Sequence, residues 1–308
     1  RPGFETVKAA VANYPESPAV NGLRDQAQAM FADLFLNGVA DSIGPVEALA
    51  IYYDFRHLTP PGARGDEMIR NLARRLVRVD LLTQAADLLQ YQLDNRLRGV
   101  ARTQIAADLA VIYLADRKPQ DALRVLNETQ LPGLPESLQR QRRLLEARAM
   151  IDGGRDQLAL DLISNMDGKD VELMRIDAHW TARRYSQAGE MIEVIYGDEP
   201  EGRPLDRSGR MGLIKAAVGY VLAGDKFGLS RLRAKFGERM VASPEWPMFD
   251  FVTGPIQATS LEFKQVAAEV AALDSLTAFL SSYRETYSGE GALTPVNASQ
   301  PDAGLASL

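Results

Sequence analysis

The residue types that most often carry out chemistry in proteins are scarce in this chain of 308 residues. It has no cysteine and only two histidines, His57 and His179. Without cysteine there is no thiolate nucleophile, no disulfide and no zinc site built on sulfur. Neither histidine belongs to a pattern such as HExxH, and a metal site needs several converging ligands. The sequence therefore predicts no metal centre, and we expect both histidines to pack or to lie at the surface.

The acidic residues are numerous, but they do not form a recognisable catalytic pair. The densest group, Asp198, Glu199 and Glu201, lies in GDEPEGRP, a stretch rich in proline and glycine. A catalytic acid needs a pocket that shifts its pKa, whereas a loop of this composition is normally solvated. The sequence has no GxSxG, GxxxxGK[ST] or GxGxxG pattern. We therefore predict no catalytic residue and no cofactor.

Arginine is the residue type whose spacing suggests binding. There are two groups: Arg70, Arg74 and Arg78, and Arg140, Arg142, Arg143 and Arg148. The first group recurs every four residues, which places it along one face of a helix. The planar guanidinium matches a carboxylate in two-point geometry, so such a face suits an acidic side chain or peptide terminus. The alternative is an ordinary charged helix face in contact with solvent.

Helical periodicity indicates which elements position these arginines. Apolar residues recur at helical spacing, for example at Ile69, Leu72, Ala73 and Leu76, and no convincing alternating strand pattern occurs. Glycine and proline separate apolar runs of about 12–20 residues, which is typical of antiparallel helix pairs.

Small residues also recur twelve positions apart along the chain. Four segments align on this spacing, with the pairs Ala73 and Ala85, Ala110 and Ala122, Ala147 and Ala159, and Ile176 and Ala188, where Ile176 replaces the usual small residue. A looser fifth copy contains Ala217, Tyr220 and Gly224, and an earlier divergent pair is expected over 23–38 and 46–58. Two helices cross closely where both present small side chains, so each segment reads as a helix, a turn and a second helix.

These segments resemble tetratricopeptide repeats, in which a unit of about 34 residues forms a helix–turn–helix. The resemblance covers roughly residues 65–235, and no copy has the full Trp…Leu-Gly…Tyr set. Residues 62–97 also resemble a segment of large uncharacterised bacterial repeat proteins of the alphaproteobacterial type. The first residue is Arg1 and not Met, so we expect a processed protein or a piece of a longer one, and this second resemblance suggests a piece of a longer chain.

The resemblance to tetratricopeptide repeats implies which residues face a partner, because the first helix of each repeat lines a concave groove. The positions so implied are Glu67, Arg70, Arg74, Val77, Gln104, Ala107, Val111, Leu114, Gln141, Leu144, Arg148, Ile151, Asp170, Leu173, Asp177 and Trp180. From these we predict as partner-binding residues Arg70, Arg74, Ala107, Val111, Leu114, Arg148, Asp177 and Trp180. The predicted groove is basic at one end, apolar in the middle and aromatic with acid at the other end.

The sequence divides into four predicted regions. These are divergent helices over 1–60, a repeat array over 61–240, an aromatic connector and C-terminal helix over 241–288, and a flexible tail over 289–308. In SPEWPMFDFVTGP (243–255), prolines bracket Trp246, Phe249 and Phe251. We expect these aromatic rings to pack against the last repeat, and the alternative is an exposed patch for a partner. The segment over about 261–287 is expected to be one long amphipathic helix that caps the array.

The expected fold is all-α, an α-solenoid of antiparallel helix pairs wound as a right-handed superhelix and closed by a C-terminal capping helix. The expected function is a non-catalytic scaffold that binds a peptide, a helix or an assembly partner. One alternative is the helical domain of an enzyme, for example a glycan-processing one. Nucleic-acid binding is a weaker alternative, because the net charge is −6 and the pI is near 5.2. No run of about 18 apolar residues occurs, so we expect no membrane insertion of this segment. The sequence leaves open the oligomeric state and the compartment, either cytoplasm or periplasm.

Overall fold

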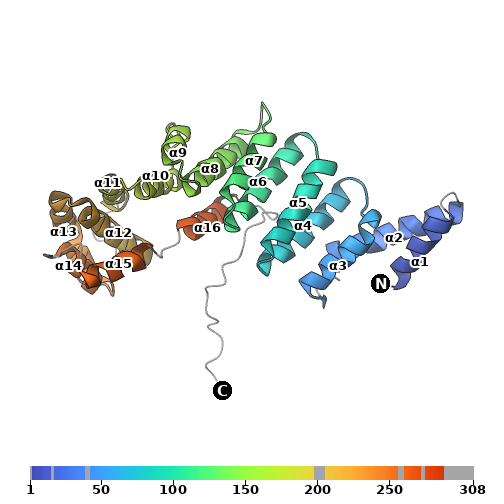
Figure 1. Cartoon of the computed structure of the whole chain (residues 1–308), viewed down its shortest axis with the longest axis horizontal. Helices are drawn as coiled ribbons and strands as arrows, with labels where there is room; N and C mark the ends of the chain where they lie inside the picture. The colour runs from blue at the N-terminus through green and yellow to red at the C-terminus, as the bar shows by residue number, and fades with distance from the viewer. Residues whose placement is uncertain are drawn as a thin grey trace, which may run out of the picture. The chain divides into compact units, whose positions relative to one another are not determined.

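The computed structural model describes residues 2–14, 17–38, 42–197, 205–255, 260–271 and 275–287. Every regular element within these ranges is helical and none is a strand, which confirms the predicted all-α class (Figure 1). No helix in the described ranges combines the length and the apolar character needed to cross a bilayer.

The helices follow one another closely along the chain. In order they are α1 (Pro2–Asn13), α2 (Pro18–Leu36), α3 (Pro45–Phe55), the short 3-10 helix η2 (Arg56–Leu58), α4 (Ala63–Arg78), α5 (Leu82–Asn95), α6 (Gly99–Ala115), α7 (Pro119–Glu128), α8 (Glu136–Asp152), α9 (Asp156–Leu162), α10 (Lys169–Thr181), α11 (Tyr185–Gly197), α12 (Arg207–Ala223), α13 (Lys226–Met240), α14 (Trp246–Thr253), α15 (Leu261–Ala271) and α16 (Ser275–Tyr287).

The helices form two compact units. The first contains α1–α7, and the second begins at Arg140, in the first turn of α8, and ends with α16. In the first unit α4 packs on α5, α5 on α6, and α6 on α7; in the second, α10 packs on α11 and α11 on α12. Consecutive helices therefore cover one another within each unit, as expected for helix pairs.

Five helix pairs share one turn geometry. In each, a residue with a left-handed φ of 56° to 72° lies seven positions after the first small residue of the pair; these residues are Asp80, Arg117, Gly154, Arg183 and Gly224. The backbone N–H that follows donates to a carbonyl five residues earlier, as from Leu81 to Leu76 at 2.9 Å and from Lys118 to Tyr113 at 2.8 Å. This is the Schellman arrangement, which ends a helix and reverses the chain. The twelve-residue spacing thus corresponds to a repeated local structure.

The small residues that carry this spacing are all buried. Ala73, Ala85, Ala110, Ala122, Ala147, Ala159 and Ala188 are fully buried, and Ile176 nearly so. At the seven alanines the lack of a large side chain lets helix backbones approach closely, which is the packing that the sequence predicts.

The first unit begins with an aromatic cluster. The ring of Phe31 in α2 lies 5.6 Å from that of Phe4 in α1 and 5.3 Å from that of Phe35, and Phe4 lies 5.3 Å from Phe55 of α3. Such edge and tilted contacts are favourable for aromatic rings. They fix α1–α3 together before the regular pairs start at α4.

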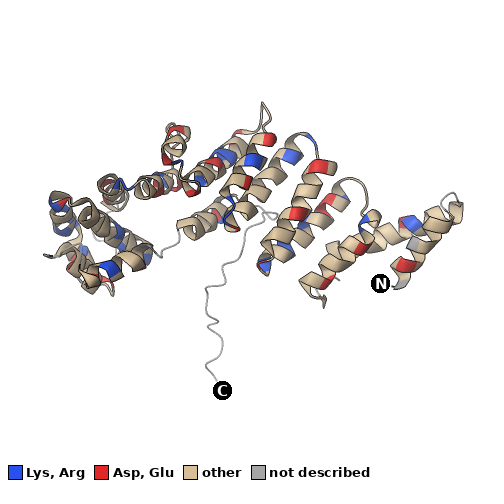
Figure 2. Ribbon diagram, viewed as in Figure 1, with Lys and Arg blue, Asp and Glu red and all other residues tan. Residues whose placement is uncertain are grey.

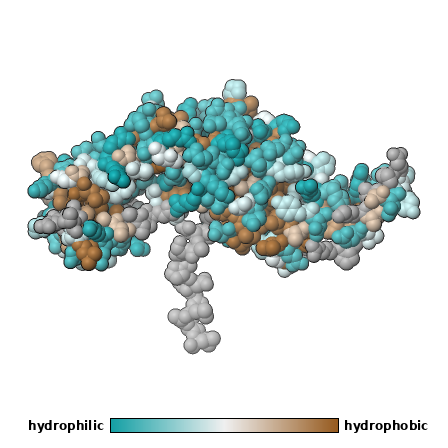
Figure 3. Space-filling view, viewed as in Figure 1, coloured by the Kyte–Doolittle hydropathy of each residue, from teal (hydrophilic) through white to brown (hydrophobic). Residues whose placement is uncertain are grey.

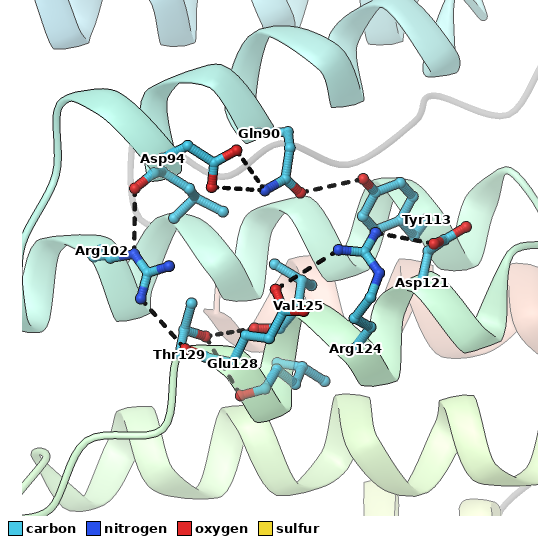
Figure 4. A network of polar contacts seen from close by, with 11 residues as sticks. Gln90, Asp94, Arg102, Tyr113, Asp121, Arg124, Val125, Glu128 and Thr129 are labelled. Carbon is cyan, nitrogen blue, oxygen red and sulfur yellow. Dashed lines mark hydrogen bonds and ion pairs between the residues drawn. The ribbon is translucent and has the colours of Figure 1, made fainter.

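A polar network joins residues of α5, α6 and α7 (Figure 4). Tyr113 donates to Gln90 at 3.4 Å, and Gln90 donates to Asp94 at 3.0 Å. Further along, Arg102 donates to the carbonyl of Glu128 at 3.3 Å. Two of these three bonds join consecutive helices, so we interpret the network as a structural one.

In the second unit, Tyr220 of α12 occupies a slot between two glycines. A Cβ atom at Gly189 would come within 2.8 Å of the ring, and one at Gly228 within 2.6 Å. The Tyr220 hydroxyl bonds to Glu193 of α11 and accepts from Arg231 of α13 at 3.0 Å. Only glycine permits such an approach, and the slot locks three helices together.

The prediction of one long C-terminal helix is wrong. The structure has two helices, α15 and α16, which bury their apolar faces against different neighbours. Phe263 and Val270 of α15 join the core built around α12, whereas Phe279 of α16 packs on the core built from α8, α9 and α10. Figure 1 shows α16 returning beside α8 and α10 instead of extending the stack. On α12 pack both α14 and α15, the first half of the predicted helix.

The aromatic segment after α13, predicted as a connector, contains the short helix α14. Phe249 is fully buried, and Trp246 is partly buried with its ring 6.1 Å from that of Phe249. The expected packing of these two aromatics is therefore found. Phe251 remains 37% exposed, and exposed hydrophobic side chains are visible in the region of α13–α15 in Figure 3.

Candidate functional site

Three of the predicted partner-binding residues lie in one polar network in the second unit. Arg148 of α8 donates from Nη1 to Oδ2 of Asp177 in α10 at 3.1 Å. The other oxygen of Asp177 accepts from Lys215 of α12 at 3.0 Å, and the Lys215 ammonium lies 5.1 Å from the centre of the Trp180 ring. The network therefore crosses α8, α10 and α12, which are the first helices of three successive pairs.

Arg148 is the centre of this network. Its side chain is 4% exposed, and its Nη2 donates to Asp152 at 2.7 Å and to the hydroxyl of Ser275 at 3.1 Å. A buried guanidinium is tolerated only when acidic groups compensate its charge, and Asp152 and Asp177 supply that compensation. Its Nε has no hydrogen-bond partner among the described residues.

The C-terminal helix α16 lies on this same surface. Gln141 of α8 donates to the hydroxyl of Tyr283 at 2.5 Å, and Arg140 donates to the hydroxyl of Tyr287 at 3.2 Å. The ring of Phe279 lies beneath Arg148, with the guanidinium carbon 5.8 Å from the ring centre. Side chains from both ends of α8 therefore contact α16.

An apolar floor completes the surface. Leu144 and Ile151, which the resemblance places in the groove, are buried in a cluster with Ala147 and Ala178. Phe279 and Tyr287 of α16 pack against this cluster. Burial of aromatic side chains on an aliphatic floor is the dominant favourable contribution in most helix-binding surfaces.

The first unit contains a second group of predicted residues. Arg70 and Arg74 of α4 both bond to Glu67 on the same helix, Arg74 at 2.8 Å. Their side chains are 34% and 23% exposed, and the Nε atom of each is buried without a hydrogen-bond partner among the described residues. These buried Nε atoms are out of reach of a partner, so only the exposed part of each guanidinium could bind one.

Asp108 of α6 faces these two arginines. It is buried, and burial raises the pKa of its carboxyl to about 7 although Arg70 and Arg74 act in the opposite direction. Burial disfavours the charged form of a carboxyl more than two partly solvated arginines favour it. Sequence reasoning missed Asp108, because a single aspartate within an apolar helical run has no distinctive pattern.

Three other predicted residues are buried. Ala107, Val111 and Leu114 of α6 are at most 1% exposed. They belong to the core in this conformation, and their predicted contact with a partner stays a prediction. The helix α6 is buried along nearly all of its length, and not on one face only.

Sequence reasoning also missed the part played by α16. Ser275, Phe279, Tyr283 and Tyr287 recur every four residues and so form a single stripe. The signal was present in the sequence, but it does not say which surface the stripe meets.

The other candidates do not form a reaction centre. His179 is half-buried in the last turn of α10, where burial and Arg184 lower its pKa, so it is neutral near pH 7. The acidic group at Asp198, Glu199 and Glu201 lies outside the described residues. Within the described ranges no cluster of three or more histidine or acidic residues could hold a metal ion.

One open concavity of about 570 Å³ lies beside α14. It is lined by Arg233, Asp250, Phe251, Thr253, Gly254 and Pro255. Arg233 bonds to Asp250 at 2.5 Å and to the Thr253 hydroxyl at 2.8 Å, so its polar groups are paired with each other. A single ion-paired carboxylate does not supply the acid and base that a hydrolytic site needs.

No protein-family model matches this chain, and no curated protein or solved structure is significantly similar to it.

Proposed function

We propose that this chain is a non-catalytic scaffold that binds a helix or peptide on the surface carried by the first helices of its pairs. The observation that supports this is the position of α16. The chain seats its own helix on α8 through Gln141, Arg148 and the neighbouring Arg140. Two of these three are groove positions that the resemblance to tetratricopeptide repeats implied.

We further propose that the pairs belong to the tetratricopeptide type and wind as a right-handed superhelix. The repeated left-handed turn, seven residues after each small residue, supports a common ancestry of the five pairs. Each pair has an apolar face that it cannot bury alone, which favours stacking.

The two alternatives have less support. For an enzyme we would expect two carboxylates with perturbed pKa values in one pocket, and Asp108 has no such acidic neighbour described. For nucleic-acid binding we would expect a continuous basic face, whereas Figure 2 shows acidic and basic residues interspersed along the helices.

The test is an affinity capture from a bacterial lysate with the whole chain, quantified by mass spectrometry. Wild type is compared with an Arg70→Glu and Arg74→Glu double variant. We expect at least one partner to be lost, because the two arginine side chains are partly exposed. If every captured protein is retained, the surface on α4 is not a partner site.

A matched control lies on the same helix. Arg78 is exposed at the end of α4, so Arg78→Glu changes charge without touching Glu67 or Asp108. Capture by this variant should match wild type. Circular dichroism establishes that each variant is folded, and Arg70→Gln with Arg74→Gln replaces the charge reversal if that variant unfolds.

A further inference from the structure

The residues of α16 that contact α8 have a regular spacing. Ser275, Phe279, Tyr283 and Tyr287 lie four residues apart, and each contacts α8 or the apolar cluster beside it. None of the four is charged. Charged residues of α16, such as Arg284 and Glu285, are exposed. The contact is therefore made by one uncharged stripe of hydroxyl and aromatic groups.

On the other side, α8 contributes hydrogen-bond donors. Nε of Arg140, Nε2 of Gln141 and Nη2 of Arg148 each donate to a hydroxyl oxygen of α16. Two of these donors are also held by acidic residues of the second unit. Arg140 bonds to Asp170 at 2.9 Å, and Arg148 bonds to Asp152 and Asp177. These two arginines are thus positioned by contacts that do not involve α16.

The charges of the surface restrict what it can bind. Because Asp152, Asp170 and Asp177 already compensate the arginines, an acidic residue in the stripe of a bound helix would add an uncompensated negative charge. A basic residue would face Arg140 and Arg148. A neutral stripe that accepts hydrogen bonds is the chemistry that fits.

The helix α16 is held by few buried residues. Of its 13 residues, only Leu276 and Tyr283 are buried. A helix of this length is marginal by itself, so its order depends on the surface that it contacts. Its hydroxyl contacts are of a kind that water or another helix can replace at small net cost.

We infer that α16 is a replaceable occupant of a helix-binding groove on α8 and α10. The partner that takes its place is an amphipathic helix with an uncharged stripe of hydroxyl and aromatic side chains four residues apart. This inference rests on the proposed scaffold function and names the class of partner.

Attachment to the same chain gives α16 an advantage over any separate helix. A tethered ligand has an effective concentration of about 1 mM, so a free helix competes against it at a penalty. Weakening α16 within the chain removes this penalty, and the apparent affinity for a free helix then rises. The direction of this change is opposite to that expected for a mutation in an ordinary binding site.

The experiment uses a fluorescent synthetic peptide with the sequence of residues 275–287 and the full chain. Binding is followed by fluorescence anisotropy. The full chain with Phe279→Ala and Tyr283→Ala should bind this peptide at least about tenfold more tightly than wild type. Arg284→Ala with Glu285→Ala is the matched control, since both residues are exposed on α16, and it should bind like wild type.

Two further variants define the groove. Adding Gln141→Leu to the weakened chain should abolish the gain, because Gln141 is the donor to Tyr283. A peptide that itself carries Phe279→Ala and Tyr283→Ala should not bind. If the weakened chain is folded and binds the peptide no more tightly than wild type does, the inference is wrong.

If the weakened variant unfolds, hydrogen exchange on the wild-type chain tests whether α16 is replaceable. Amides of α16 should exchange faster than those of α8 and α10, and equal protection would show that α16 is an integral helix. A wild-type dimer that disappears in the weakened variant would assign the groove to a second copy and overturn the inference.

These outcomes are separable from the proposed function. If the peptide does not bind but charge reversal at Arg70 and Arg74 still removes a partner, the scaffold function is retained and the inference about α16 is wrong. If the peptide binds as expected but no capture depends on the two arginines, α4 is not a partner site and the inference about α16 is retained.

Discussion

Arg74 and Arg148 occupy the same position in two different repeats, and the structure places them in opposite situations. Arg74 is 23% exposed and bonds to Glu67 on its own helix. Arg148 is 4% exposed and bonds to Asp177 of a different helix pair and to Ser275 of α16. The repeat position alone therefore fixes which face of the helix a side chain is on. Whether that side chain is available to a partner depends on what the rest of the chain places there.

The comparison also separates two kinds of ion pair. A pair within one exposed helix face contributes little, because water screens it and both side chains must be ordered. A buried pair between helices is costly to break, because removal of one partner leaves a charge uncompensated. The two arginines should therefore differ sharply when each is removed.

The largest expected effect is that of Arg148→Met. We expect the second unit to lose about 3 kcal/mol in free energy of unfolding, because Asp152 and Asp177 lose their shared partner. Arg74→Met should cost less than about 1 kcal/mol. Trp180 and Trp246 both lie in the second unit, so urea unfolding followed by tryptophan fluorescence measures the first change. Circular dichroism measures the second, and equal losses would remove the distinction between the two sites.

The next effect concerns pH and the first unit. The pKa of the Asp108 carboxyl is raised to about 7 in the folded chain. In the unfolded chain an aspartate has a pKa of about 4, so the unfolded chain releases this proton first as pH rises. The folded chain then binds more protons than the unfolded chain, so stability from this group falls between about pH 4 and pH 7. Between pH 5 and pH 6.5 the loss should be about 2 kcal/mol relative to Asp108→Asn.

This second prediction is measured as a difference between two chains. Thermal or urea unfolding of wild type and Asp108→Asn is compared at both pH values, so that other titrating groups cancel. A parallel pH dependence in the two chains would show that Asp108 titrates normally.

A smaller effect should distinguish the hydroxyls of α16. Tyr283→Phe leaves the buried amide of Gln141 without its acceptor and should cost about 1 kcal/mol. Tyr287→Phe should cost less, because Arg140 keeps its bonds to Asp170. Hydrogen exchange in α16 measures both, and the reverse order would contradict the contact described for Gln141.

The smallest effect concerns the shared turn. Arg117 in the first unit and Gly154 in the second occupy the same left-handed position. Replacing Arg117 by glycine should stabilise the first unit by about 0.5 kcal/mol, because relief of backbone strain exceeds the entropy that glycine adds to the unfolded chain. Gly154→Ala should destabilise by a similar amount. Thermal unfolding measures both changes. If the two substitutions change stability in the same direction, the argument is refuted.

The sequence predicts the local structure of the pairs well, because that structure depends on neighbours. The twelve-residue spacing of Ala110 and Ala122 marks the two helices, and the left-handed residue between them follows from the need to reverse the chain. The buried small residues are likewise set by the approach of two adjacent helices.

Prediction failed where distant parts of the chain meet. The segment over 261–287 has continuous helical periodicity, although Asp274 and Ser275 are residue types that favour a helix start. Periodicity shows that a face is apolar, but it does not show that Phe263 meets α12 while Phe279 meets α8. For the same reason, the sequence predicts only part of the candidate site. The spacing of the repeats predicts Arg148 and Asp177, but it does not predict Ser275 and Tyr283.

The separation along the chain between α8 and α16 has a consequence for the order of folding. The bonds from Arg148 to Ser275 and from Arg140 to Tyr287 span 127 and 147 residues, whereas each helix pair closes within a few turns. Contacts between distant residues form late, because a long loop must close first. At the usual rates of synthesis, on the order of ten seconds pass between emergence of α8 and emergence of α16. During synthesis the face of α8 is therefore exposed in every molecule before α16 has been made. The first helix to bind this face need not be α16.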